Sequence, residues 1–95
     1  MDDLTDAAAI RALRQMPNVG PSIARDLLSL GIRQPADLKR RNPKRLYDQL
    51  CALTGQRHDP CVLDTFMAAV AFAKTGVDRK WWEFTPTRKR RFPLI

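Results

Sequence analysis

The stretch PNVGPSIA, residues 17–24, separates two segments that otherwise have helical spacing. Proline lacks an N–H group and suits the first turn of a helix, because that donor would have no partner there. We therefore expect a helix that ends at Met16, a tight turn, and a second helix that begins at Pro21. Asn18 and Gly20 are residue types that tolerate a positive φ, so the backbone can fold back there. The stretch predicts a helical hairpin.

The same proline signal recurs along the chain. Three further helix starts are marked by the pairs Gln34-Pro35, Asn42-Pro43 and Asp59-Pro60. Apolar residues recur at intervals of three and four, and β-branched residues do not alternate with period two, so no sheet is expected. The spacing predicts an all-α fold of five short helices, at residues 4–16, 21–30, 35–41, 43–54 and 60–75.

Length and composition restrict the chain to one small domain. Its 95 residues, 44% of them apolar, allow one modest core, and they contain no apolar run of the length that spans a membrane. The N-terminus MDDLTDAAAI is acidic where a secretion signal would be basic, so we expect a cytoplasmic protein. We assign residues 1–78 to the helical domain and residues 79–95 to a basic, aromatic extension, partly packed and partly flexible.

The formal net charge of +7 is concentrated near the C-terminus. Residues 79–95 hold six basic side chains against one acidic side chain, whereas residues 1–78 hold eleven basic and nine acidic side chains. A basic excess of this kind favours polyanionic partners, although many proteins share it.

The hairpin itself offers an anion site. A helix that begins at Pro21 turns its first N–H groups outward, beside the positive end of its dipole. Gly20 has no side chain to keep an anion away from those groups. A phosphate oxygen fits such a site.

The run N-V-G-P-S-I-A-R, residues 18–25, resembles the helix-hairpin-helix motif of DNA repair and recombination proteins. In that family the hairpin amides bind a backbone phosphate without reading the base sequence. The resemblance implies phosphate contacts by position, at the backbone amides around Gly20, Ser22 and Ile23 and at the Arg25 side chain.

Asn18 stands where the usual motif has its first hairpin glycine. Asparagine also tolerates the left-handed region, so the turn is kept, and we include this residue in the phosphate site. Some family members bind a monovalent cation through hairpin carbonyls, which the resemblance places near Met16 and Val19. No other cofactor is expected.

Four segments extend the resemblance over residues 8–84. These segments are PNVGPSIARDLLSLGI, PADLKRRNPKRLYDQL, DPCVLDTFMAAVAFA and KWW, and they resemble the small bacterial helix-hairpin-helix proteins of the pathogenicity-locus family. More distantly they are similar to the C-terminal domain of the competence regulator TfoX. The resemblance implies a tandem helix-hairpin-helix domain of SAM-like type, with a degenerate second hairpin at 53–59, and it brings no enzymatic activity.

Two groups of cations and aromatics leave alternatives open. The first group extends a phosphate footprint or forms a solvated surface, and it comprises Lys39, Arg40, Arg41, Lys44 and Arg45. In the C-terminal extension, Trp81 and Trp82 either stack on nucleic-acid bases or pack over the helices. The cations that follow contact nucleic acid, bind a partner or form a disordered tail, and they are Arg88, Lys89, Arg90 and Arg91.

Metal and enzyme chemistry have little support. Cys51, His58 and Cys61 supply three ligands without the paired spacing of a zinc site, and the two cysteines are expected to stay reduced. The single histidine has no nucleophile at a readable spacing. We therefore expect a non-catalytic module that binds DNA phosphates without sequence preference, as an accessory in repair, recombination or uptake. The alternative is a protein-protein adaptor that uses the hairpin and the aromatic, basic tail.

Overall fold

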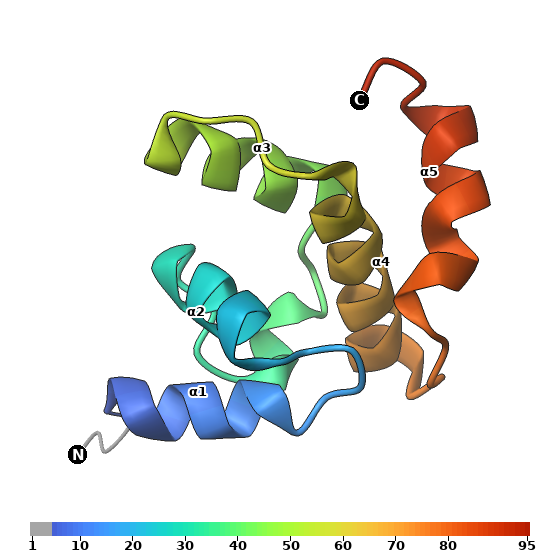
Figure 1. Ribbon diagram of the computed structural model, residues 1–95. Coiled ribbons are helices and arrows are strands. Elements are labelled where there is room, and N and C mark those ends of the chain that lie inside the picture. The colour runs from blue at the N-terminus through green and yellow to red at the C-terminus, as the bar shows by residue number, and fades with distance from the viewer. Residues whose placement is uncertain (1–4) are drawn as a thin grey trace.

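The helix α4, Pro60–Thr75, is the element on which most of the fold packs (Figure 1). The computed structural model describes residues 5–95, and within that range it is all-α, with five α-helices and no strands. The elements in contact with α4 are α3 (Pro43–Thr54), α5 (Thr85–Arg91) and two short 3-10 helices, η1 (Pro35–Leu38) and η2 (Trp81–Phe84). α1 (Asp6–Arg14) and α2 (Pro21–Ser29) pack on each other. The all-α prediction is confirmed.

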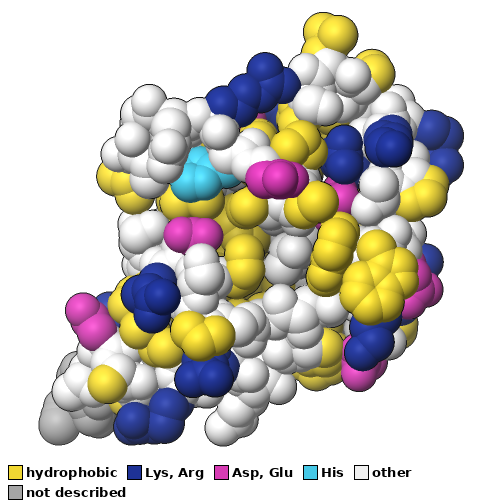
Figure 2. All heavy atoms as spheres, viewed as in Figure 1, with side chains coloured by type: hydrophobic (Ala, Val, Ile, Leu, Met, Phe, Trp, Pro, Cys, Tyr) yellow, Lys and Arg dark blue, Asp and Glu magenta, His cyan; other side chains and the backbone are white. Residues whose placement is uncertain are grey.

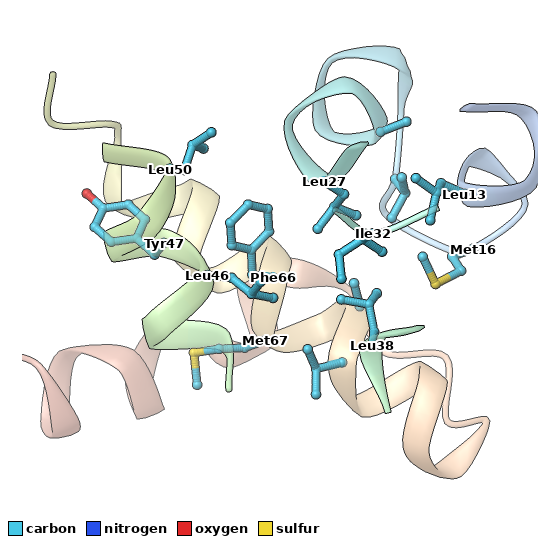
Figure 3. Close-up of a cluster of buried hydrophobic side chains, with 14 of the residues drawn as sticks. Leu13, Met16, Leu27, Ile32, Leu38, Leu46, Tyr47, Leu50, Phe66 and Met67 are labelled. Atoms are coloured by element: carbon cyan, nitrogen blue, oxygen red, sulfur yellow. The ribbon is translucent and has the colours of Figure 1, made fainter. Parts of the chain in front are cut away.

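The core surrounds the middle of α4. Residues 63–70 of this helix are all buried, so it is covered around its whole circumference. Phe66 lies in the centre of the core, with Leu46 and Leu50 of α3 on one side and Leu27 and Ile32 on the other (Figure 3). Each fully buried large apolar side chain contributes about 1.5–3 kcal/mol to folding. The core thereby joins the α1–α2 pair to the α3–α4 pair.

The proline signals mark three helix starts correctly. α3 and α4 also end at the predicted residues, and the three starts are Pro21, Pro43 and Pro60. Asn42 and Asp59 cap α3 and α4, because their side-chain oxygens accept hydrogen bonds of 2.9 and 2.8 Å from first-turn amides. Gly55 and Gly76 end the same helices with positive φ values of 68° and 77°.

The helix predicted at 35–41 is wrong beyond its first turn. The segment holds only η1, because Asn42 must be extended before Pro43 and has φ −93° and ψ 121°. The Asp37 carboxylate closes the other end of this turn, where it accepts hydrogen bonds of 2.9 and 3.2 Å from the two amides ahead of Pro35. The chain has room for one turn between these two constraints.

α1 ends at Arg14 and not at Met16. The amides of Gln15 and Met16 donate to carbonyls three residues earlier, at 3.3 and 3.1 Å, which is the tighter pattern of a 3-10 turn. The helix begins at Asp6, because Thr5 is its extended N-cap, with φ −62° and ψ 163°, and the predicted start at residue 4 itself lies outside the described residues.

The fifth α-helix lies in the C-terminal extension and not within the first 76 residues, where the sequence predicted all five. A buried ion pair fixes it: Arg88 Nε lies 2.9 Å from Asp64 Oδ1, and the two residues are 7% and 0% exposed. Thr85 donates a hydrogen bond of 2.7 Å to the second carboxylate oxygen. The hydrogen bonds from Arg88 also raise the pKa of its guanidinium above the ordinary value. α5 thus supplies the partners that a carboxylate inside α4 requires.

Candidate nucleic-acid interface

The turn between α1 and α2 places Gly20 at the N-cap of α2 with open space around it. Asn18 takes the left-handed conformation of the turn, with φ 70°. Gly20 is extended, with φ −91° and ψ −173°, so it does not use the positive φ that the sequence suggested. A Cβ atom added to Gly20 would meet no atom within 4 Å. Gly20 is therefore important because it leaves the N-terminus of α2 open, and not because of its backbone conformation.

The N-terminus of α2 has no side-chain cap. In contrast, α1, α3 and α4 are each capped by a side-chain oxygen, from Thr5, Asn42 and Asp59 in turn. The first intrahelical bond of α2 joins the Ala24 amide to the Gly20 carbonyl at 2.9 Å, so the amides of Ser22 and Ile23 precede it. Two backbone donors at the positive end of a helix dipole form the geometry that binds anions.

Side chains near this end of α2 differ in exposure. Ser22 and Arg25 are exposed, Ile23 is partly buried, and Ala24 is fully buried. The exposed Arg25 guanidinium adds a positive charge to α2 near these amides. The Met16 carbonyl, one of the two that the sequence linked to a cation, accepts a hydrogen bond of 3.3 Å from the Val19 amide.

Asn18 connects the turn to a segment far along the chain. Its side-chain amide donates to the Arg79 carbonyl at 2.8 Å, and its side-chain oxygen accepts from the Trp81 amide at 3.1 Å. Both polar groups of a side chain that the sequence placed in the phosphate site are used in these bonds. They hold residues 79–82 beside the hairpin.

This connection brings cations to the hairpin that the sequence did not single out. Arg79 and Lys80 are both exposed. Arg79 lies 3.4 Å from Glu83 and packs over the Phe84 ring at 4.9 Å. The sequence showed only that Asn18 brings a donor and an acceptor that need partners, where glycine would suffice for the turn, and it did not show which residues those partners are.

The two tryptophans separate the alternatives that the sequence left open. Trp81 is partly buried, whereas Trp82 is 56% exposed. Their rings lie edge to face with centroids 5.6 Å apart. Trp81 therefore packs back onto the fold, and Trp82 leaves an aromatic surface beside the hairpin.

The basic run at 39–45 lies between η1 and the first turn of α3. Lys39, Arg40 and Arg45 are exposed. Lys44 pairs with Asp48 at 2.8 Å, and Arg41 donates to the neutral Gln49 at 3.4 Å. One of the five cations is thus neutralised by a neighbouring carboxylate, whereas the others keep their charge.

The C-terminal cations divide in the same way. Arg88 is buried on Asp64 and is not placed to contact a nucleic acid, whereas Lys89, Arg90 and Arg91 are exposed. On the face in Figure 2, Lys and Arg side chains lie over the α1–α2 pair and over the C-terminal extension. A cavity of about 340 Å³, the basic pocket, joins cations of both groups, and its cationic lining is Arg40, Arg41, Lys44, Lys74 and Arg91.

The residues considered as metal ligands are held in local contacts. Cys51 and Cys61 are free thiols, and burial raises the pKa of the Cys61 thiol. His58 Nε2 lies 2.8 Å from the Thr54 hydroxyl, and Tyr47 donates to the His58 carbonyl. Within residues 5–95 no three His, Cys, Asp or Glu side chains gather as a metal site would need, and no helix there has the length and apolar character to cross a membrane.

Comparison with known proteins shows that the sequence matches a protein family and a named protein from Streptomyces. The sequence model of the family Cdd1, described as pathogenicity locus, matches residues 6–90. The chain is also similar to the mitomycin resistance protein McrB of Streptomyces lavendulae, with 47% identity over 78 residues that cover 82% of this chain and 74% of the relative. No solved structure matches it.

Proposed function

The chain belongs to the Cdd1 family, pathogenicity locus, and from this premise we propose that it is a non-catalytic helix-hairpin-helix module that binds the phosphate backbone of DNA without sequence preference. The observation that carries the proposal is the uncapped N-terminus of α2, where Gly20 leaves open space in front of the Ser22 and Ile23 amides. An oxygen of a phosphodiester is the natural ligand for such donors.

Charge around the hairpin supports a nucleic acid as the source of that phosphate. Arg25 is exposed on α2, and the bonds of Asn18 bring the exposed Arg79 and Lys80 alongside. Cations arranged around a phosphate site extend contact to neighbouring phosphates of a strand and release counterions. Trp82 adds an exposed ring on which an unpaired base stacks.

The name of the Streptomyces relative suggests a cellular setting. That protein is named for resistance to mitomycin. We propose that the present chain acts as an accessory to DNA repair, recombination or uptake, and that it takes part in the same resistance. Expression of the chain in a mitomycin-sensitive host should raise survival in the drug, and the Gly20→Asp variant should not.

The direct test is fluorescence anisotropy of a labelled duplex and a labelled single strand at about 50 and 200 mM salt. Affinity should fall steeply with salt, with a log-log slope of about −0.9 for each phosphate neutralised on duplex DNA. Gly20→Asp places a carboxylate at the N-cap of α2, where it accepts from the amides and repels phosphate. We expect this variant to bind DNA much more weakly than the wild type and to remain folded, since the added side chain meets no neighbour.

Gln56→Glu is the matched control for that variant. It makes the same change in charge at an exposed position in the α3–α4 turn, outside the turn between α1 and α2. Affinity close to that of the wild type in Gln56→Glu, together with loss in Gly20→Asp, supports the hairpin. Equal affinity of a folded Gly20→Asp protein would remove the hairpin from the proposal.

An adaptor that binds another protein is the second candidate. Two apolar side chains between α4 and α5 are exposed, Trp82 at 56% and Val77 at 47%. A protein interface centred on them would depend little on salt, because apolar contacts are not screened. Absence of DNA binding at micromolar protein, with salt-insensitive capture of a protein through Trp82, would favour this candidate.

A further inference from the structure

The basic pocket collects cations from three parts of the chain that are far apart in sequence. Arg40, Arg41 and Lys44 come from the segment that leads into α3 and from its first turn, Lys74 from the last turn of α4, and Arg91 from the end of α5. No acidic residue lines this cavity of about 340 Å³. The grouping is tertiary, since a run of basic residues alone would not include Lys74 or Arg91.

Most of these charges have no internal counterion. Lys44 is paired with Asp48, but no carboxylate in the described part of the chain lies within ion-pair distance of Arg40, Lys74 or Arg91. Like charges in so small a space repel one another, and an anion between them removes that repulsion. The pocket therefore has a positive potential that the fold itself does not neutralise.

Two of the pocket cations, Lys44 and Arg91, contact the same aromatic ring. Lys44 Nζ and Arg91 Cζ lie 5.5 and 5.3 Å from the centroid of the Phe92 ring, so two separate segments meet on one aromatic side chain. α5 is held in turn by the buried pair of Arg88 and Asp64. Docking of α5 thus completes the pocket.

Charge indicates which anion fits. A phosphodiester carries one negative charge, which a single cation balances, whereas a phosphate monoester carries about −1.5 to −2 and three acceptor oxygens. Arg40, Arg41, Lys74 and Arg91 together exceed what one diester needs. We infer that the basic pocket binds a phosphate monoester, and specifically the terminal phosphate of a DNA strand, for which a 5′-phosphate is the probe; the choice of DNA as its source rests on the proposed function.

The test compares duplexes that carry or lack a 5′-phosphate at the unlabelled end. Hydrogen bonds to a charged group contribute about 1.5–3 kcal/mol, so wild-type protein should prefer the phosphorylated duplex by about tenfold or more. The pocket variant Lys74→Gln/Arg91→Gln should bind both duplexes with equal affinity. A ratio near one for the wild type, or an unchanged ratio in the pocket variant, would overturn the inference.

The control Lys39→Gln/Arg45→Gln removes the same two charges outside the pocket. Both residues belong to the basic run, are exposed and do not line the cavity. This variant should weaken binding of both duplexes alike and keep the tenfold preference. Circular dichroism of each variant, with wild-type helical signal, ensures that a lost preference reports on the pocket and not on unfolding.

A second readout separates this inference from the proposed function. Gly20→Asp should weaken the binding of both duplexes, and the remaining binding should still favour the 5′-phosphate.

If the wild type binds no DNA, thermal unfolding in tripolyphosphate tests the pocket alone. A rise in melting temperature for wild type and Lys39→Gln/Arg45→Gln, but not for Lys74→Gln/Arg91→Gln, would keep a phosphate site with free phosphates as its source. No rise would overturn it.

Discussion

Asn18 is the residue at which the hairpin and the C-terminal segment meet. Its positive φ makes the turn, and its side chain holds the Arg79 carbonyl and the Trp81 amide. The residue type was readable from the sequence as a turn former, but its two long-range partners were not, since they lie more than sixty residues away. A local pattern carries no information on such pairs.

Asn18→Gly should keep the turn and lose these bonds. Glycine adopts the same φ without strain, so the hairpin remains, but residues 79–82 lose two hydrogen bonds. We expect a loss of about 1–3 kcal/mol in the free energy of unfolding, at about 0.5–1.5 kcal/mol for each bond. Urea denaturation measures it, and hydrogen exchange of the Trp81 amide should accelerate.

Asn18→Asp is the matched control for this residue. It retains an acceptor for the Trp81 amide and loses the donor to the Arg79 carbonyl. Its stability should lie between those of the wild type and Asn18→Gly. A glycine variant as stable as the wild type would show that the two bonds contribute nothing.

At the scale of elements, the prolines and capping residues gave the most accurate predictions, because they mark where helices begin and end. α3 and α4 match their predicted bounds at both ends, because each is framed by an N-cap, a proline and a left-handed glycine. η1 and α1 were predicted too long, because apolar spacing continues past the point where the backbone leaves the helix. The same limit holds for the candidate site. The sequence predicted the turn and the helix start at Pro21, but it did not predict the residues that the Asn18 side chain contacts.

The cap of α4 makes its stability depend on pH. The hydrogen bond from the Cys61 amide is the main cause that holds the pKa of Asp59 below its ordinary value of 3.8. The carboxylate therefore stabilises the fold above that value, and this contribution disappears as pH falls through the lower pKa of the folded state. Thermal unfolding of the wild type between about pH 5 and 2 should show the loss, in the window expected for a carboxylate with a lowered pKa.

Asp59→Asn is the comparison for the pH series. Asparagine also caps helices but does not titrate in this range, so the variant should start near wild-type stability and lose less on acidification. Glu83 has its pKa lowered by the Lys80 amide and adds a slope common to both proteins. Parallel pH profiles for wild type and Asp59→Asn would exclude Asp59 as the source.

At the scale of the molecule, the docking of α5 on α4 closes the fold. The sequence TPTRKRR of α5 has no apolar stripe, so periodicity could not identify it as a packed helix. The ion-pair partner of α5, Asp64, is unusual in the sequence only because it is the one acidic residue within the apolar α4. A carboxylate in a helix that is buried on all sides requires a cation as its partner. The sequence did not show which of the basic residues would be that partner.

Removal of Arg88 should therefore affect the whole domain. Arg88→Ala leaves the buried Asp64 unpaired, which costs about 3–5 kcal/mol. Small domains have about 5–15 kcal/mol of stability in total, so chemical denaturation should show a large shift or a loss of cooperative unfolding. The 5′-phosphate preference should fall as well, because Arg91 is carried by the same helix.

The double variant Asp64→Leu/Arg88→Met distinguishes a missing partner from lost packing. It removes both charges and keeps apolar volume, so it should be far more stable than Arg88→Ala, and close to the wild type. Equal destabilisation of the single and double variants would show that the ion pair has no special part in holding α5.

The link between the hairpin and residues 79–82 has a practical consequence. The only two tryptophans of the chain lie in η2, and Trp81 is hydrogen-bonded through its amide to the hairpin turn. Indole emission depends on the polarity around the ring, and the exposed Trp82 is open to quenching. The molecule thus carries its own fluorophore next to the surface where a ligand would dock, and occupancy of the hairpin can be followed on the native chain without any attached dye.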